Sequence, residues 1–409
     1  MSERFNVDVL AWGKRAFEQD PSLDFDGLVR ALPGVHPDDV RRTLGNLQAS
    51  GQHKSPQRIQ GLHVESLRGL PAPHPLDYDW RFSTATVREL AGRASVLTPR
   101  CGAIALLGIP SLFGELREKR PDARLMLADR SAPSVDAVAS IFKSEQLIVC
   151  DLLSTSLPSV SADVVIADPP WYPEFFDAFT WAAARMIPIG GHLLLCGPNH
   201  GTRPGATTEW EQIGRYAESL GFELSGVREP LRYDTPPFEF NALGAAGHPR
   251  MSSDWRTGLL STFRRIRTSA ATRRVSQCDP TEWEEHMVDG VRWRVRRKVK
   301  QERVSPVLRE LVAGDILNSV SRRDLRRTHV DLWSSGNRVL GCADTYAASL
   351  ILHALATGAS PVTYVEHSLG RQLNRVERDA VQASGRRLKT IIEVEQEEYL
   401  RSLETLSVS

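Results

Sequence analysis

The chain has 409 residues and a formal net charge of +1 at pH 7; 41% of its residues are hydrophobic and 25% are charged. This composition is typical of folded globular proteins and excludes a chain that is disordered throughout. No run of about 18 apolar residues occurs, so no membrane-spanning helix is expected. The polar residues 1–6 are unlike a signal peptide. The length predicts two or three domains.

The cysteines exclude two common kinds of small stabilised domain. They are spread widely, and none belongs to a C-x-x-C motif or to a cluster with histidine. We therefore expect neither a zinc site nor a disulfide framework, and no other metal site. A reducing cytoplasm is the expected location. The cysteines are Cys101, Cys150, Cys196, Cys278 and Cys342.

The first segment of the chain predicts a small helical module. Apolar residues recur at helical intervals through residues 7–47, which predicts three short helices. The third carries Arg41, Arg42 and Gln48. This winged-helix-like module either reads nucleic acid or forms a helical cap on the next domain. The proline-rich residues 71–75 that follow predict a linker.

The C-terminal part mixes strand and helix signals. Residues 291–296 alternate with period two, which predicts a strand with one basic face. Residues 346–356 predict a buried helix, and residues 369–403 predict one or two long charged helices. We expect a basic, mostly helical C-terminal domain of mixed α+β type. The three expected domains are residues 1–70, 76–270 and 271–409.

Five short apolar runs predict the core of the central domain. Each is about five residues long, and helical stretches separate them. Strands that are apolar throughout are buried on both faces, which predicts an α/β fold with a parallel sheet covered by helices. Most of the runs stop at Gly or Asp, and ligands bind beyond the carboxyl ends of such strands. The runs are residues 103–107, 124–128, 146–150, 163–167 and 192–196.

The fourth run is followed by Asp168-Pro169-Pro170-Trp171-Tyr172. Two prolines remove two backbone donors and fix the direction of the chain after the strand. The Asp168 carboxylate and the Pro169 carbonyl can then accept hydrogen bonds from an amino group and orient its lone pair. Trp171 and Tyr172 offer flat faces for a base drawn out of its stack. We therefore predict that residues 168–171 form a catalytic loop for chemistry on an amino nitrogen.

This motif carries a family resemblance. Asp-Pro-Pro-Trp after an apolar strand resembles the fourth motif of the amino-methyltransferases, and its Trp resembles the adenine-N6 group. The resemblance covers residues 76–267, about half of the chain. It implies a Rossmann-like α/β fold with a seven-stranded sheet and S-adenosylmethionine as the cofactor. It also implies DNA or RNA as the partner, with an exocyclic amino group as the acceptor.

The loop after the first apolar run is the expected place of the cofactor. Gly108 and Gly114 would let the backbone approach its methionine part, and Pro110 and Ser111 lie between them. The run of alternating glycines that is usual in the family is absent. This departure resembles the branched-polyamine synthases, which have an N-terminal winged helix and a D-P-P motif. Those enzymes transfer aminopropyl groups from decarboxylated S-adenosylmethionine.

Two acids at strand ends complete the expected cofactor site. Asp129 lies 21 residues after Gly108, a spacing that suits an acid on the ribose hydroxyls. Asp151 suits a contact with the adenine amino group. Both acids could instead cap the turns that follow their strands. The aromatic, proline-rich residues 233–240 either wall the substrate pocket or form an ordinary hairpin that closes the sheet.

A basic segment suggests the kind of partner. Residues 250–327 contain 19 Lys and Arg against 10 Asp and Glu. Segregated positive charge suits a nucleic-acid backbone, and Arg294 and Arg296 are the expected substrate contacts. A solvated basic surface is the alternative interpretation.

Three functions remain open at this point. The favoured one is an S-adenosylmethionine-dependent methyltransferase that acts on an exocyclic amino group of a nucleic-acid base, adenine N6 in particular. The second keeps the fold and transfers a methyl or aminopropyl group to a small amine. The third is a catalytically inactive, nucleic-acid-binding methyltransferase-like module. Acidic walls around the site would favour a polycationic acceptor.

Overall fold

The described chain folds into two compact units. The computed structural model describes residues 2–44, 69–143, 145–155, 157–226, 228–248, 251, 254–269, 271–274, 282–298 and 302–407. Unit 1 comprises Met1–Leu70, Trp80–Thr235 and Arg250–Cys278. Unit 2 comprises Pro71–Asp79, Pro236–Pro249 and Asp279–Ser409. The helical N-terminal segment thus belongs with the central sheet, whereas the proline-rich segment belongs with the C-terminal unit.

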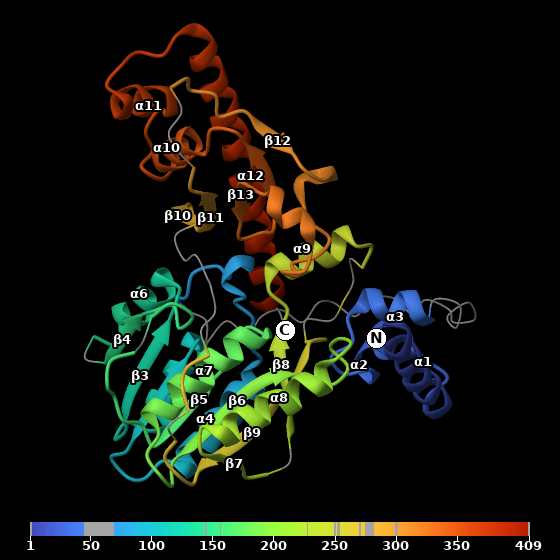
Figure 1. Ribbon diagram of the computed structural model, residues 1–409. Helices are drawn as coiled ribbons and strands as arrows, with labels where there is room; N and C mark the ends of the chain where they lie inside the picture. Colours follow the sequence, from blue (N-terminus) through green and yellow to red (C-terminus); the bar gives the residue numbers. More distant parts are fainter. Residues whose placement is uncertain are drawn as a thin grey trace. The chain divides into compact units, whose positions relative to one another are not determined.

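Unit 1 is built on a mixed sheet of nine described strands (Figure 1). Their order is β1-β8-β9-β6-β5-β2-β3-β4, and β7 also pairs with β9. Strands β2 to β6 run parallel, whereas β9 runs antiparallel to β6, β7 and β8. The strands are β1 (Arg81–Phe82), β2 (Ala103–Leu107), β3 (Arg124–Asp129), β4 (Gln146–Val149), β5 (Val164–Ala167), β6 (His192–Pro198), β7 (Phe222–Leu224), β8 (Glu229–Asp234) and β9 (Thr257–Arg265). The predicted Rossmann-like α/β fold is confirmed.

The parallel part of this sheet reverses its strand order between β2 and β5. From β2 the chain adds β3 and β4 on one side, and it then returns to add β5 and β6 on the other. The loops after the two central strands diverge at such a reversal, and ligands bind in the crevice beyond the carboxyl ends. Residues that follow β2 and β5 therefore meet at the expected binding edge.

The sheet differs from the expectation in two respects. It has nine described strands rather than seven, because β1 pairs with β8 and because β7 and β8 pair separately with β9. The third apolar run was expected to be buried on both faces, yet in β4 both Gln146 and Val149 are exposed. The reason is position: β4 is the edge strand, paired on one side only.

Helices connect the strands of unit 1. Ser83 and Ser131 begin α4 and α6 by accepting hydrogen bonds from backbone N–H groups, and Pro173 starts α7. The core lies on the sheet, where residues such as Leu106 and Val165 have no exposed surface. The helices are α1 (Ser2–Gln19), α2 (Phe25–Ala31), α3 (Pro37–Leu44), α4 (Thr84–Leu97), η2 (Pro110–Leu112), α5 (Phe113–Lys119), α6 (Ala132–Ile141), α7 (Pro173–Met186) and α8 (Ala206–Ser219).

The N-terminal module has the three predicted helices and packs on the loop after β6. A Cβ added to Gly34 would lie 2.7 Å from the Cβ of Asn199, so the two segments are in close contact. The ring of His36 lies edge-on to Trp255, with 5.5 Å between the ring centroids. These contacts favour the interpretation of the module as a helical cap. Gln48, one of its expected contact residues, lies outside the described residues.

Unit 2 combines an antiparallel sheet with helices. Its five described strands have the order β10-β11-β13-β14-β12. The predicted strand, the buried helix and the charged C-terminal helix are present as β11, α10 and α12. The expectation of a mostly helical domain missed most of the sheet, since β12 to β14 are only three or four residues long. The elements are η1 (Pro75–Asp77), α9 (Pro237–Ala245), β10 (Trp283–Val288), β11 (Val291–Arg296), β12 (Leu308–Glu310), η3 (Ala313–Asp315), η4 (Leu325–His329), β13 (Leu332–Ser334), β14 (Val339–Cys342), α10 (Thr345–Ala356), α11 (Pro361–Leu369) and α12 (Arg375–Ser407).

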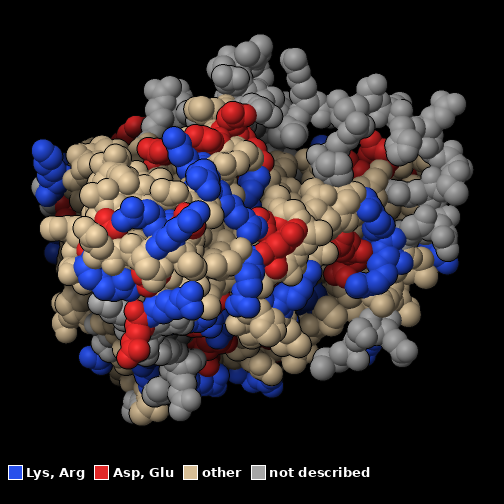
Figure 2. All heavy atoms as spheres, turned by 90° about the horizontal axis from the view of Figure 1, so that it is seen from above, with Lys and Arg blue, Asp and Glu red and all other residues tan. Residues whose placement is uncertain are grey.

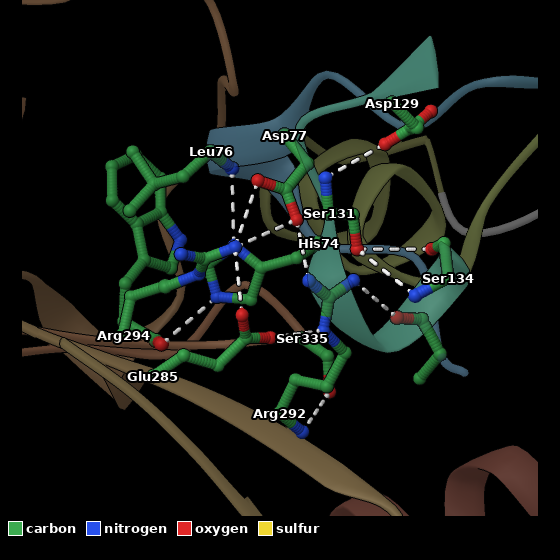
Figure 3. A network of polar contacts seen from close by, with 12 residues as sticks. His74, Leu76, Asp77, Asp129, Ser131, Ser134, Glu285, Arg292, Arg294 and Ser335 are labelled. Atoms are coloured by element: carbon green, nitrogen blue, oxygen red, sulfur yellow. Dashed lines mark hydrogen bonds and ion pairs between the residues drawn. The ribbon is translucent and has the colours of Figure 1, made fainter. Parts of the chain in front are cut away.

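The predicted proline-rich linker is an integral part of unit 2. His74 is fully buried, and its Nε2 lies 3.1 Å from the Trp333 carbonyl oxygen. Its Nδ1 accepts a hydrogen bond from the Leu76 N–H (Figure 3). Burial lowers the pKa of His74 well below its usual value, so the ring is neutral. Arg292 donates to the Ala72 carbonyl, and such contacts hold a segment whose prolines have no N–H of their own.

Two features are absent from the part of the chain that the structure describes. None of its helices combines the length and the apolar character that a membrane crossing requires. No three His, Cys, Asp or Glu side chains within it are grouped so that they could hold a metal ion.

Candidate active site

Asp168 lies at the reversal point of the sheet, beside the loop after β2. Its N–H donates to the Leu107 carbonyl over 3.2 Å, and the Gly108 N–H donates to the Ala128 carbonyl over 2.9 Å. A Cβ added to Gly108 would lie 3.3 Å from the Asp168 carbonyl oxygen. With a φ of +73°, position 108 favours glycine on conformational grounds as well. The structure thus brings Gly108 and Asp168 together, as their strand positions predicted.

Tyr233 of β8 holds the carboxyl group of Asp168. The tyrosine hydroxyl is buried and donates to Asp168 Oδ1 over 2.9 Å. Asp168 is partly buried, and among the described residues its Oδ2 has no hydrogen-bond partner. Burial raises the pKa of Asp168 to about 7, although the Tyr233 hydrogen bond and the charge of Arg256 act to lower it. Oδ2 is therefore available to a substrate and able to exchange a proton near neutral pH.

A glycine lets Tyr233 reach Asp168. β9 and β6 separate β8 from β5, so the tyrosine side chain must cross them. At the crossing, a Cβ on Gly258 of β9 would lie 3.0 Å from Tyr233 Cε2 and 3.0 Å from Trp171 Cζ2. It would also lie 2.7 Å from the Gly197 carbonyl oxygen. A side chain at position 258 is therefore incompatible with the observed place of both rings.

We expect Gly258→Ala to impair activity. The new methyl group would crowd the Gly197 carbonyl oxygen and both rings, so β9 or the rings must shift. We expect either shift to lengthen the Tyr233–Asp168 hydrogen bond. In an assay of the methyl transfer that the sequence predicts, we expect kcat/KM to fall at least about tenfold, which corresponds to ~1.4 kcal/mol. Gly214→Ala in α8 is the matched control, because a Cβ there meets no atom within 4 Å. Equal activity of the two variants would contradict the importance of the tyrosine.

Trp171 is buried against Arg256. The guanidinium carbon of Arg256 lies 4.3 Å from the centroid of Trp171 and 3.9 Å from that of Trp80. Tyr233 packs edge-on against Trp171 at 5.5 Å. The guanidinium covers the tryptophan ring, which is 7% exposed. This arrangement makes Trp171 a wall of the site and does not favour the expected open platform for a base.

The two prolines direct the chain from the strand into α7. Pro169 is buried and Pro170 is half-buried. The Tyr172 N–H donates to the Pro170 carbonyl over 2.7 Å, and Tyr172 is the N-cap of α7. The Tyr172 side chain stays half-buried, so it is the aromatic residue of the predicted loop with accessible surface.

The predicted cofactor acids both hold turns at the same edge. Asp129 Oδ1 accepts from the Ser131 N–H over 2.7 Å (Figure 3). Asp151 Oδ1 accepts from the Leu153 N–H over 3.0 Å, and its Oδ2 lies 3.8 Å from Arg130 Nη2. The turn-capping interpretation is therefore correct for one oxygen of each acid. Asp151 Oδ2 is buried without a hydrogen-bond donor among the described residues, so it can accept one from a bound group.

The rest of the predicted cofactor loop is a short helical turn. Pro110 and Ser111 are buried in η2, and Gly114 lies in the first turn of α5. A Cβ on Gly114 would meet no atom within 4 Å, so packing gives no reason for glycine there. Within this loop, Gly108 is the position at which close backbone approach requires glycine.

The basic segment of β11 is neutralised by carboxylates within unit 2. Arg292 is fully buried and pairs with Asp77 and Glu285. Arg294 pairs with the same two acids at 2.9 and 3.0 Å (Figure 3), and Arg296 pairs with another glutamate. On the face drawn in Figure 2, basic and acidic side chains are intermingled. These ion pairs do not favour the expected role of Arg294 and Arg296 as substrate contacts.

A Ser-His-Glu cluster in unit 2 lacks the geometry of a catalytic triad. Ser349 Oγ lies 2.9 Å from His286 Nε2 and donates to Glu284 Oε2 over 3.0 Å. Glu284 Oε1 lies 3.6 Å from the same Nε2. In a triad the acid binds the other ring nitrogen and leaves Nε2 free to take the serine proton. We therefore assign this cluster a structural role.

Three residues of the site were missed by sequence reasoning. Tyr233 was expected only as part of a pocket wall or of a hairpin that closes the sheet, and Arg256 and Trp80 were not singled out. Each is separated from Asp168 by more than 60 positions in the sequence. Gly258 was an available signal, because a glycine within a strand often marks the close approach of another group.

Comparisons with known proteins bear on the fold. No protein-family model matches the chain, and no curated protein matches it in sequence. Among solved structures, the chain is similar to the branched-chain polyamine synthase of Thermus thermophilus, solved with N4-aminopropylspermidine and 5'-methylthioadenosine. The TM-score is 0.52 at 14% identity, over 68% of this chain and 91% of that chain. The two proteins share a fold.

Two further solved structures are more distant. The N-methyltransferase NodS of Bradyrhizobium japonicum, solved with S-adenosyl-L-homocysteine, has a TM-score of 0.33 at 16% identity, over 50% of this chain and 98% of that chain. TrmN of Thermus thermophilus has a TM-score of 0.31 at 12% identity, over 44% of this chain and 48% of that chain. Scores this low add nothing to the assignment of the fold.

Proposed function

We propose that the chain transfers an alkyl group from a sulfonium donor of the S-adenosylmethionine type to the nitrogen of a small aliphatic amine. The observation that carries the proposal is the Asp168 carboxyl group. It lies at the reversal point of the sheet next to Gly108, Tyr233 holds its Oδ1, and its Oδ2 has no partner among the described residues. The donor is S-adenosylmethionine or its decarboxylated form, so the transferred group is methyl or aminopropyl.

The loops around Asp168 fit such a donor. Gly108 permits a close backbone approach, and the buried Asp151 Oδ2 needs a donor such as an adenine amino group. Asp129 lies at the end of β3, between β2 and β4, where an acid can accept hydrogen bonds from the ribose hydroxyls. A bound sulfonium supplies an electron-poor carbon that a neutral amine can attack.

The pKa of Asp168 suits an acceptor that arrives as an ammonium ion. Aliphatic amines resemble lysine, whose pKa is about 10.4, so they are protonated at neutral pH and must lose a proton before they attack. Asp168, with a pKa of about 7, can accept that proton at Oδ2 while Tyr233 keeps Oδ1 occupied. An exocyclic amino group of a base is uncharged and needs no such proton acceptor. The raised pKa therefore favours the small-amine alternative.

Two observations weigh against a nucleic-acid base as the acceptor. The arginines of β11 form ion pairs with Asp77 and Glu285, and Arg256 covers Trp171. The small-amine alternative consequently replaces adenine N6 in this proposal. The similar polyamine synthase was solved with an aliphatic polyamine, which agrees with this choice. An inactive module is not favoured, because an uncommitted carboxylate oxygen serves no purpose in a purely structural site.

The test is a transfer assay with both donors. Purified protein is incubated with S-adenosylmethionine or its decarboxylated form, together with a panel of aliphatic diamines and polyamines, and in parallel with DNA and RNA. Mass spectrometry identifies the products. We expect a methylated or aminopropylated amine that Asp168→Asn does not produce. Modification of nucleic acid alone would reject the small-amine acceptor, and calorimetry that detects binding of neither donor would reject the enzyme.

Tyr233→Phe is expected to shift the pH dependence of this transfer upward. The Tyr233 hydrogen bond lowers the pKa of Asp168, so its removal raises that pKa and keeps the carboxyl protonated to higher pH. We expect kcat/KM at pH 7 to fall about tenfold and to recover as the pH is raised. A loss of equal size at every pH would instead indicate a disturbed fold.

A further inference from the structure

We propose that Arg256 is a positioning residue of the acceptor site: Trp80 and Trp171 clamp its guanidinium group, and its carbonyl is bonded to Tyr233, the residue that holds Asp168. The inference rests on the proposed function, because it concerns the group that takes the acceptor's proton. It adds a residue that neither the motif nor the strand ends indicated.

The clamp is formed by two tryptophans from distant parts of the chain. Trp80 directly precedes β1, Trp171 follows the two prolines, and their centroids lie 3.9 and 4.3 Å from the guanidinium carbon of Arg256. The guanidinium carbon therefore lies over both rings. Each contact stabilises the cation, and the planar guanidinium suits this stacking better than a lysine ammonium does. The positive charge therefore has a fixed place.

The backbone of Arg256 is tied to the residue that holds Asp168. The Tyr233 N–H donates to the Arg256 carbonyl over 3.1 Å, and the Tyr233 hydroxyl donates to Asp168. One residue of β8 thus sets the places of both the cation and the carboxyl group. A shift of Arg256 would move Tyr233, and with it the hydrogen bond on Oδ1.

Among the described residues, Arg256 is a cation that interacts with the Asp168 carboxyl group. The groups that face Asp168 come from three elements: Tyr233 from β8, Cys196 from β6, and Arg256 from the segment before β9. Burial and the charge of Asp168 raise the pKa of the Cys196 thiol and of the Tyr233 hydroxyl, so both are neutral. The charge of Arg256 lowers the pKa of Asp168 and opposes the effect of burial. Without it, the carboxyl group would keep its proton to higher pH.

The clamp also gives the N-terminal module a physical link to the site. Trp80 lies edge-on to Trp255 at 6.1 Å, and Trp255 lies edge-on to His36 at 5.5 Å. His36 stands just before α3 of the module. This chain of ring contacts connects the module with the clamp, in agreement with a module that caps unit 1.

The test separates the charge of Arg256 from its shape. Carbon-13 NMR of aspartate carboxyl groups follows the titration of Asp168, whose signal is assigned by its absence in Asp168→Asn. We expect Arg256→Gln, which keeps a planar end but loses the charge, to raise the pKa of Asp168 by about one unit. Arg256→Lys keeps a charge and should shift it less. Arg232→Gln, which removes a half-exposed cation paired with Asp254, should leave it unchanged.

The transfer reaction provides the second measurement. We expect Arg256→Gln to lower kcat/KM about tenfold at pH 7, with recovery at higher pH, and Arg256→Lys to show less pH dependence. If Arg256→Gln does not fold, Trp80→Leu loosens the clamp and should raise the pKa of Asp168 by a smaller amount. An unchanged pKa in the folded variants would overturn the inference.

The two proposals can fail separately. The NMR titration requires no substrate, so a shifted pKa supports the clamp even if no amine is modified. Conversely, amine transfer by the wild type with an unchanged pKa in Arg256→Gln would support the proposed function and reject the clamp.

Discussion

Asp168→Asn is expected to abolish transfer while leaving the site intact. The amide has the shape of the carboxyl group, and its oxygen can still accept the Tyr233 hydrogen bond, but it cannot take a proton from the acceptor. Loss of a positioned proton acceptor reduces rates by about 100- to 10,000-fold. The measurement is single-turnover transfer, at several pH values, with the amine that the panel assay identifies. Transfer within a factor of two of the wild type would exclude Asp168 as the proton acceptor.

The same substitution is expected to stabilise the protein above neutral pH. The usual pKa of the side chain is 3.8, and burial raises it to about 7 in the folded chain. Because the folded chain holds this proton to higher pH than the unfolded chain, the wild type loses stability as the pH rises from about 4 to about 7. Three pKa units correspond to about 4 kcal/mol, and partial exposure of Asp168 reduces this to ~2–3 kcal/mol.

Urea unfolding at two pH values tests this linkage. At pH 5 the stability advantage of Asp168→Asn should be less than half of its full size, because the unfolded wild-type chain has lost this proton whereas the folded chain still holds it. At pH 8 the variant should be the more stable one. A difference that is the same at both pH values would contradict the raised pKa. Gain of stability with loss of activity is the pattern expected of a residue kept for chemistry.

Asp77→Ala is expected to destabilise unit 2 by ~3–5 kcal/mol. The Asp77 carboxylate is buried and accepts hydrogen bonds from both Arg292 and Arg294. Burial alone would lower the pKa of Arg292, but Asp77 and Glu285 raise it, so the buried guanidinium stays charged. Removal of Asp77 leaves the Arg292 charge with one of its two carboxylate partners, Glu285. The expected cost is therefore that of a poorly compensated buried charge, which is larger than the cost of losing a surface ion pair.

Glu393→Ala is the matched control for this prediction. Glu393 pairs with Lys389, their side chains are 58% and 67% exposed, and exposed pairs contribute about 0–1 kcal/mol. Two measurements compare the two variants. Circular dichroism monitors their unfolding in urea, and hydrogen exchange reports on the amides of β11. Loss of exchange protection in β11 should accompany Asp77→Ala alone. If both variants unfold like the wild type, the network around Arg292 does not stabilise the unit.

The amino-acid sequence determined the parallel sheet and the place of its binding edge. Five apolar runs with helical stretches between them have few ways to bury both faces, and a parallel sheet is the common one. Gly108 and Asp168 each directly follow such a run, so they were bound to reach the carboxyl edge of the sheet. The residues of the loop with two prolines, which resemble a motif of the amino-methyltransferases, added the expectation of chemistry on an amino nitrogen.

Charge could not be interpreted from the sequence alone. Arg292 and Arg294 looked like a free basic face, because their partner Asp77 lies 215 and 217 positions away, at the expected start of the central domain. Ion pairs form between residues that the fold brings together, and local composition does not predict partners that are distant in the sequence. For this reason the structure does not favour the nucleic-acid contact that the sequence of β11 predicted.

The partners of Asp168 were likewise decided by the tertiary structure. Local sequence determined which residues end strands, since burial and turn chemistry act over a few positions. Which aromatic ring crosses β9, and which cation lies between Trp80 and Trp171, depends on the antiparallel pairing of β8, β9 and β6. That pairing brings Tyr233, which is 65 positions from Asp168 in the sequence, to the carboxyl group. The close approach of two rings to Gly258 likewise becomes visible only once the strands are side by side.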